Sequence, residues 1–128
     1  MAKRIITVDD APIIRLMIKD VLVECGKFDV VAECSNGREA VEKYKELKPD
    51  LVTMDIIMPE MDGIQALEEI LKFDPNAKVV MVTAIDQRES LMKAIRLGAT
   101  DYIVKPFEAD RVMSAVQKAL GESPETAP

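Results

Sequence analysis

Short, nearly continuous apolar segments alternate five times with segments of helical spacing along this 128-residue chain. The apolar segments occupy residues 5–8, 28–32, 51–54, 79–82 and 102–104. Because apolar side chains fill successive positions in these segments, each predicted strand should be buried on both faces, as in a parallel sheet. Between them, apolar residues recur every three or four positions, which is typical of amphipathic helices.

Residues that favour helix ends lie between the predicted strands and helices. Possible N-terminal caps are Asn36 with Glu39, Asp62 with Gln65, and Asp86 with Glu89, and glycines at 26, 98 and 121 suit helix C-termini. Five β-α units predict an α/β fold with a parallel sheet, right-handed crossovers and helices on both faces. We expect one domain over residues 1–120 and a disordered tail over the polar, proline-rich residues 121–128.

Composition excludes several classes of function. The net charge of −6 argues against direct binding to nucleic acid or to an anionic membrane surface, because both require a basic face. The sequence has neither a long apolar run nor a signal-peptide pattern, so we expect a cytoplasmic protein without a membrane span. It contains no histidine, which rules out a phosphohistidine carrier and the usual zinc-ligand patterns.

Polar residues follow four of the five predicted strands. They are Asp9 and Asp10, Asp55, Thr83, and Lys105. Taken singly, each has an ordinary structural explanation, such as a helix cap, a strand position or a surface lysine. Together they indicate a site, because the carboxyl ends of parallel strands meet at one edge of the sheet, where ligands bind in such folds.

The chemistry of these groups points to phosphoryl transfer. Two carboxylates 4 Å apart repel by about 4 kcal/mol at an effective dielectric of 20, and a divalent cation relieves this repulsion. Oxygen ligands without His or Cys favour Mg²⁺. A cation, a lysine and a hydroxyl together suit the three equatorial oxygens of a phosphoryl group. Asp55 is the candidate nucleophile, because it lies in the apolar run MDIIMP while the adjacent Asp9 and Asp10 suit metal binding.

Four motifs carry a family resemblance. RIITVDDA, DLVTMDIIMPEMDG, VMVTA and DYIVKPF occur in this order, and the similarity spans residues 3–120. The chain resembles the response-regulator receiver domains of two-component systems, and within them the free-standing chemotaxis regulators of the CheY type. The resemblance implies a flavodoxin-like (βα)5 three-layer sandwich. Its strand order, 2-1-3-4-5, is the one described for CheY-type folds and comes from the resemblance alone.

The resemblance also implies a role for each site residue. Asp55 corresponds to the phosphorylated aspartate. Asp10 and Asp55, with the backbone carbonyl of Ile57, correspond to direct Mg²⁺ ligands. Asp9 corresponds to the acid that holds the metal, often through water. Lys105 corresponds to the lysine that pairs with the phosphoryl group.

Further positions correspond to the switch and its partners. Thr83 and Tyr102 resemble the pair that responds to phosphorylation, residues 87–120 resemble the output surface, and the Lys105–Pro106 peptide is expected to be cis. The implied partners are a CheA-like histidine kinase that donates from a phosphohistidine, a flagellar motor switch protein or another output protein, and a phosphatase. The protein would promote its own Mg²⁺-dependent phosphorylation and dephosphorylation without being a turnover enzyme.

Two alternatives remain, namely the receiver of a transcriptional regulator and a phosphorelay intermediate. Enzymes of other classes are disfavoured, because the P-loop pattern GxxxxGK[ST] is absent and the acid pair is adjacent rather than D-x-D. Ile57 and Ile85 stand where many relatives have polar side chains. They cannot orient an attacking water, so we expect a long-lived phosphorylated state.

Overall fold

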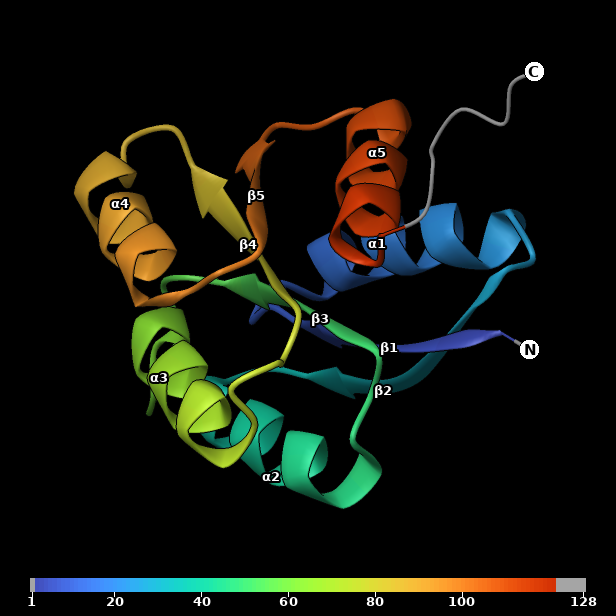
Figure 1. Ribbon diagram of the computed structural model, residues 1–128. Helices are drawn as coiled ribbons and strands as arrows, with labels where there is room; N and C mark the ends of the chain where they lie inside the picture. The colour runs from blue at the N-terminus through green and yellow to red at the C-terminus, as the bar shows by residue number, and fades with distance from the viewer. Residues whose placement is uncertain (1, 122–128) are drawn as a thin grey trace.

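The computed structural model describes residues 2–121, and this range contains five strands and five helices in strict alternation (Figure 1). The elements are β1 (Lys3–Val8), α1 (Pro12–Glu24), β2 (Phe28–Cys34), α2 (Gly37–Leu47), β3 (Leu51–Asp55), α3 (Gly63–Phe73), β4 (Val79–Ala84), α4 (Arg88–Leu97), β5 (Asp101–Lys105) and α5 (Ala109–Ala119). All neighbouring strands are parallel, in the order β2-β1-β3-β4-β5. The expected fold and strand order are confirmed.

The sheet forms the middle of three layers. Helices α1 and α5 cover one face, and α2 and α3 cover the other (Figure 1). Helix α4 packs on the side of α2 and α3, where its Ala94 is completely buried. The short second apolar segment extends further than its sequence suggests, since β2 continues to Cys34 beside β1.

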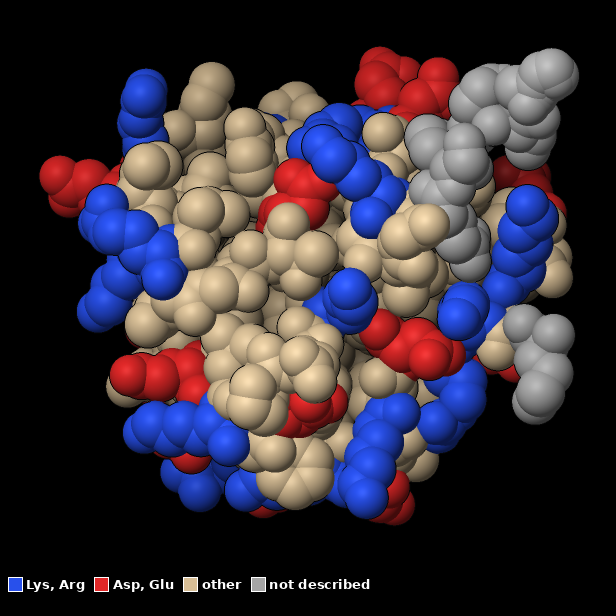
Figure 2. Space-filling model, viewed as in Figure 1, with Lys and Arg blue, Asp and Glu red and all other residues tan. Residues whose placement is uncertain are grey.

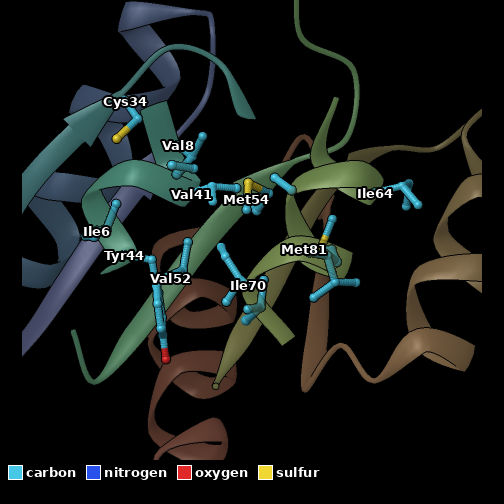
Figure 3. Packing of buried hydrophobic residues seen from close by; sticks show 14 of the residues in the cluster. Ile6, Val8, Cys34, Val41, Tyr44, Val52, Met54, Ile64, Ile70 and Met81 are labelled. Carbon is cyan, nitrogen blue, oxygen red and sulfur yellow. The ribbon is translucent and has the colours of Figure 1, made fainter. Parts of the chain in front are cut away.

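Successive residues of β3 point into the two different cores. Val52 and Met54 pack under α2 and α3, where Figure 3 shows them among side chains from several strands and helices. Leu51, which is also fully buried, belongs to the core beneath α1 and α5. This alternation is the reason that the central strands are apolar at nearly every position.

The same alternation directs the acidic residues to one side of the sheet. Alternate residues of β3 point to the same face of the sheet, and on the side of α1 and α5 these are Leu51, Thr53 and Asp55. Thr7 pairs with Thr53 across the β1–β3 ladder, and Asp9 follows Thr7 by two residues. The hydroxyls of both threonines are buried without a protein hydrogen-bond partner, so a polar layer lies below the carboxylates.

Two of the three predicted N-terminal caps are present in the structure. The cap at Asp62 is complete, and the cap at Asn36 has only one of its two expected hydrogen bonds. Asp62 forms a complete capping box with Gln65. Asn36 caps α2 by accepting from the Glu39 backbone, but the Glu39 side chain instead accepts from Ser35.

The third cap is wrong, since Gln87 occupies the N-cap of α4 and makes no side-chain cap. The backbone N–H of Gln87 donates to the Ala84 carbonyl, which closes a turn after β4. That turn moves the helix start one residue beyond Asp86.

The glycines predicted at helix ends all have positive φ, at 78° for Gly26, 123° for Gly98 and 76° for Gly121. These values lie in the region that glycine adopts without strain. The predicted tail, residues 121–128, lies outside the described residues except for Gly121. Within residues 2–121, no helix has both the length and the hydropathy required to cross a membrane.

Candidate functional site

Three carboxylates meet at the carboxyl edge of the sheet, as predicted. Asp9 and Asp10 follow β1, Asp55 ends β3, and one oxygen from each lies within 4.8 Å of the others. Asp9 and Asp55 are buried, whereas Asp10 is exposed. These three residues and Lys105 are called the acid pocket below.

Asp9 is held tightly on both its backbone and its side chain. Its N–H donates to the Cys34 carbonyl at 3.0 Å, and its Oδ1 accepts from the Ala11 N–H at 2.9 Å. Its Oδ2 is buried, lies 3.1 Å from Lys105 Nζ, and has no well-aligned hydrogen-bond donor. One oxygen of this carboxylate therefore has only an ion pair to compensate its burial.

Lys105 pairs with both buried acids at once. Its Nζ lies 3.1 Å from Asp9 Oδ2 and 3.3 Å from Asp55 Oδ1. Burial lowers the pKa of Lys105, but Asp55 and Asp9 together outweigh this effect and raise the pKa above its ordinary value. Lys105 is therefore a fixed positive charge, and the following peptide to Pro106 is cis, as expected.

Asp55 is less acidic than an ordinary aspartate. Its burial and then the nearby Asp9 raise its pKa from 3.8 to about 6, against the opposing effects of Lys105 and of the Ile56 N–H. The Ile56 N–H donates to Oδ1 at 2.9 Å. The pocket thus contains three carboxylates and one ammonium group, an excess of negative charge that costs free energy.

The pocket has the properties of a site for a hard divalent cation. Its donors are three carboxylates, with no sulfur or imidazole, and they converge closely enough to share one ion. Among the described residues, Lys105 is the one cation paired with the two buried carboxylates, and the buried Asp9 Oδ2 accepts no hydrogen bond, so the pocket has room in its electrostatics for a further positive charge. These residues fit Mg²⁺, with Asp9, Asp10 and Asp55 as the side chains that would hold it.

Two glycines allow the loop after β3 to make close backbone contacts. The Gly63 N–H donates to the Ile56 carbonyl at 2.7 Å, and a Cβ at Gly63 would lie 2.0 Å from the Asp55 carbonyl oxygen. A Cβ at Gly37 would lie 2.4 Å from the Met61 carbonyl oxygen. No larger residue fits at either position without backbone movement, so these contacts fix the loop that carries Ile57.

Thr83 and Tyr102, the predicted switch pair, lie beside the pocket rather than in it. Both line a groove of about 330 Å³ between α4 and the ends of β4 and β5. The other lining residues are Ala84, Ile85, Arg88, Leu91, Met92, Ile95 and Val104, and this surface is called the α4–β5 groove below. The Thr83 hydroxyl donates to the Ala84 carbonyl at 3.2 Å, and the half-exposed Tyr102 ring packs beside Arg111.

Ile57 and Ile85 are both exposed. Their exposed fractions are 59% and 82%, which are high for large apolar side chains. A side chain that is 82% exposed has little packing of its own. This exposure disfavours a purely structural role in which Ile57 and Ile85 pack on each other.

Arg15 contacts the pocket, although the sequence analysis did not select it. Its Nη1 donates to the backbone carbonyl of Asp9 at 2.6 Å. The only signal in the sequence is a cation five residues after Asp10 that interrupts the apolar stretch IIRLMI. Such a signal is weak, because an arginine on a helix is most often a surface residue.

A doubly wound parallel sheet with converging acids and one lysine at its carboxyl edge is the arrangement expected of a receiver domain. The Response regulator receiver domain profile matches residues 5–117, and the chain belongs to this family.

The similar proteins include chemotaxis regulators. Chemotaxis protein CheY of Bacillus subtilis is 59% identical over 120 residues, covering 94% of this chain and 99% of that protein. CheY of Thermotoga maritima is 55% identical over 118 residues, covering 92% and 98%. A crystal structure of the CheX-CheY-BeF3-Mg²⁺ complex from Borrelia burgdorferi contains a chain that is 33% identical, with a TM-score of 0.85 and coverage of 91% and 87%.

Proposed function

We propose that this protein is a chemotaxis response regulator that accepts a phosphoryl group on Asp55 from a partner histidine kinase. Residues 1–120 would form the receiver domain. The observation that carries the proposal is the double ion pair of Lys105 with Asp9 and Asp55 inside a cluster of three carboxylates. High identity to CheY proteins over nearly the whole chain supports the assignment to chemotaxis.

The geometry suggests which atom of Asp55 reacts. Oδ1 accepts from the Ile56 N–H and pairs with Lys105, which leaves Oδ2 as the nucleophile. Oδ2 attacks the phosphorus of the kinase phosphohistidine, the P–N bond breaks, and the imidazole leaves with the electron pair and takes up a proton. Mg²⁺, when bound, supplies positive charge for the carboxylates and the phosphoryl oxygens.

Lys105 then changes its partner. Its ammonium lies next to both acids before the reaction, and it can pair with a phosphoryl oxygen once Asp55 is phosphorylated. Asp55 is consumed as a nucleophile in each cycle and is regenerated by hydrolysis. The protein therefore acts as a substrate and switch for its partners rather than as a turnover enzyme.

The α4–β5 groove is the proposed output surface. It is apolar and open, with Met92 45% exposed and Tyr102 40% exposed. Figure 2 shows Lys and Arg side chains over α4, which carries Arg88, Lys93 and Arg96 in a chain of net charge −6. An output protein such as the flagellar motor switch would contact this face and, by charge complementarity, would present acidic residues to it.

Phosphorylation tests the proposal directly. The protein is incubated with Mg²⁺ and acetyl phosphate, and the mass of the intact chain is measured. We expect one added phosphate in the wild type and none in Asp55→Asn. The control Asp86→Asn removes an exposed carboxylate outside the pocket and should label like the wild type. Equal labelling of Asp55→Asn would refute the assignment.

Mg²⁺ binding should stabilise the fold before any phosphorylation. At a hundredfold excess over its dissociation constant, a ligand that binds only the folded state adds about 2.7 kcal/mol to the free energy of unfolding. A thermal melt with and without Mg²⁺ measures this gain. The gain should be largely lost in Asp10→Ala, whereas Asp20→Ala, at an exposed position on α1, should retain it.

A further inference from the structure

Arg15 makes a contact that the phosphoryl-transfer chemistry described above does not use. Its side chain is only 19% exposed, and its Nη1 donates to the Asp9 carbonyl at 2.6 Å. The hydrogen bond joins a charged donor to a backbone acceptor, which makes it stronger than a neutral one. It also crosses from the second turn of α1 back to the loop that carries the acid pair.

The Asp9 carbonyl belongs to the peptide between the two adjacent acids of the pocket. Strand β1 ends at Val8, so this carbonyl lies beyond the strand, and Asp9 itself is 2% exposed. The carbonyl belongs to the peptide plane that joins Asp9 to Asp10. Because a peptide group is rigid and planar, fixing that carbonyl restrains ψ of Asp9 and φ of Asp10 together. One hydrogen bond therefore restrains the stretch of backbone from which both carboxylates extend.

A purely structural role for Arg15 would be to tie α1 to β2. Its Nε lies 3.6 Å from Glu33 Oε1, but this is a loose ion pair. Lys19, one turn further along α1, already pairs with the same carboxylate at 3.1 Å. A cation near a helix N-terminus is also mildly unfavourable for the helix dipole. The contact of Arg15 with Asp9 is thus what sets it apart from Lys19.

We propose that Arg15 is a positioning residue, which holds the Asp9–Asp10 peptide so that both carboxylates converge on a divalent cation. The inference rests on the proposed function, since it assigns a role in the same pocket. It predicts that Arg15 changes the affinity for Mg²⁺ without touching the ion. Residues that orient metal ligands in this way change metal affinity by about 10- to 100-fold when they are replaced.

Lys19 offers a matched control. Arg15→Gln and Lys19→Gln each remove one positive charge from α1, and each removes one partner of Glu33. Only Arg15→Gln removes the hydrogen bond to Asp9. Isothermal titration calorimetry with MgCl₂ gives the dissociation constant for each protein, and urea unfolding in EDTA gives the stability of the metal-free fold.

We expect the Mg²⁺ dissociation constant to rise about tenfold in Arg15→Gln and to stay within about twofold of the wild type in Lys19→Gln. Amide NMR of the metal-free proteins should show shifts at Asp9, Asp10 and Ala11 only in Arg15→Gln. Arg15→Lys, which keeps a donor of similar reach, should have an intermediate affinity, and it provides the test if Arg15→Gln does not fold.

Equal Mg²⁺ affinity in Arg15→Gln and Lys19→Gln would overturn the inference, as would a loss of stability in Arg15→Gln with wild-type affinity. Failure of the proposed function has a different signature. In that case the wild type itself would show no heat of Mg²⁺ binding and no phosphorylation of Asp55.

Discussion

The acid pocket and the α4–β5 groove lie at the same edge of the sheet but differ in almost every physical property. The pocket is mostly buried, charged and assembled from residues as far apart as Asp9 and Lys105. The groove is open and mainly apolar. Eight of its nine lining residues belong to β4, α4 or β5, and all nine fall between residues 83 and 104. The pocket holds unfavourable charge that a ligand can relieve, whereas the groove holds apolar surface that a partner can cover.

Thr83 is the shortest structural link between the two regions. It lines the groove, yet it follows Val82, which pairs with Asp55 across the ladder. Its hydroxyl donates to the neighbouring Ala84 carbonyl and makes no hydrogen bond to Asp55. A new acceptor at Asp55 would compete for that hydroxyl, and this competition gives a physical route from the pocket to the groove.

The largest expected effect separates the regions by how strongly one substitution destabilises the fold. Gly63→Ala places a Cβ 2.0 Å from the backbone oxygen of Asp55, which cannot move without distorting the pocket. We expect a loss of more than about 3 kcal/mol in the free energy of unfolding, together with loss of phosphorylation. Met92→Ala in the groove should change stability by less than about 1 kcal/mol. Urea unfolding followed by circular dichroism measures the free energy of unfolding of both variants. Equal losses would contradict the proposed difference between the acid pocket and the groove.

The next effect concerns the electrostatic cost of the pocket. The pKa of Asp55 is raised to about 6 by burial and by Asp9. The folded state therefore holds a proton more tightly than the unfolded state between about pH 4 and pH 6. Stability associated with this group is present below pH 4 and is lost as the pH rises through 6.

Asp55→Asn removes this titration. In EDTA, we expect the variant to be more stable than the wild type by roughly 2 kcal/mol at pH 7, and the difference to shrink towards pH 4. Asp20→Asn, an exposed carboxylate on α1, should show no such pH-dependent difference. Urea unfolding at several pH values gives the curves. A stability difference between Asp55→Asn and the wild type that does not change with pH would contradict the shifted pKa.

A smaller effect is expected from a substitution that weakens the coupling between the acid pocket and the α4–β5 groove but leaves the residues of the acid pocket unchanged. Thr83→Ala keeps all three carboxylates and Lys105 but removes the hydroxyl beside the groove. A charge-assisted hydrogen bond to a phosphoryl oxygen contributes about 1.5–3 kcal/mol, and a complete switch requires about 5.5 kcal/mol. We therefore expect near-normal phosphorylation and a reduced response in the amide NMR shifts of residues 87–120. Identical shifts in the phosphorylated variant and wild type would exclude this route.

The smallest effect concerns the lifetime of the phosphorylated state. Ile57 and Ile85 are exposed and apolar, so neither can orient a water for attack on the phosphoryl group. The double variant Ile57→Asn with Ile85→Glu should dephosphorylate about tenfold faster, equivalent to about 1.4 kcal/mol in the activation free energy. Loss of radiolabel over time measures the rate. Met92→Ala serves as an exposed apolar control, and an unchanged rate in the double variant would remove any kinetic role.

Several features were predictable because they depend on local pattern. The apolar runs at 51–54 and 79–82 identify strands that are buried on both faces, and the capping box of Asp62 and Gln65 marks the start of α3. The wrong cap at Asp86 shows the limit of such patterns. Spacing alone does not reveal that the turn between Ala84 and Gln87 shifts the helix by one residue.

The sequence by itself determined the five β-α units and the positions of the acids and the lysine at the strand ends, since residue type and periodicity decide which segments are buried and where strands stop. The sequence also indicated that these groups converge, but only the tertiary structure decided which atoms pair. Lys105 pairs with Asp9 and Asp55 because the strand order brings β1, β3 and β5 to one edge. Arg15 reaches the Asp9 carbonyl because α1 folds back over its own loop. Contacts between residues distant in sequence depend on how whole elements pack, and no local pattern encodes that packing.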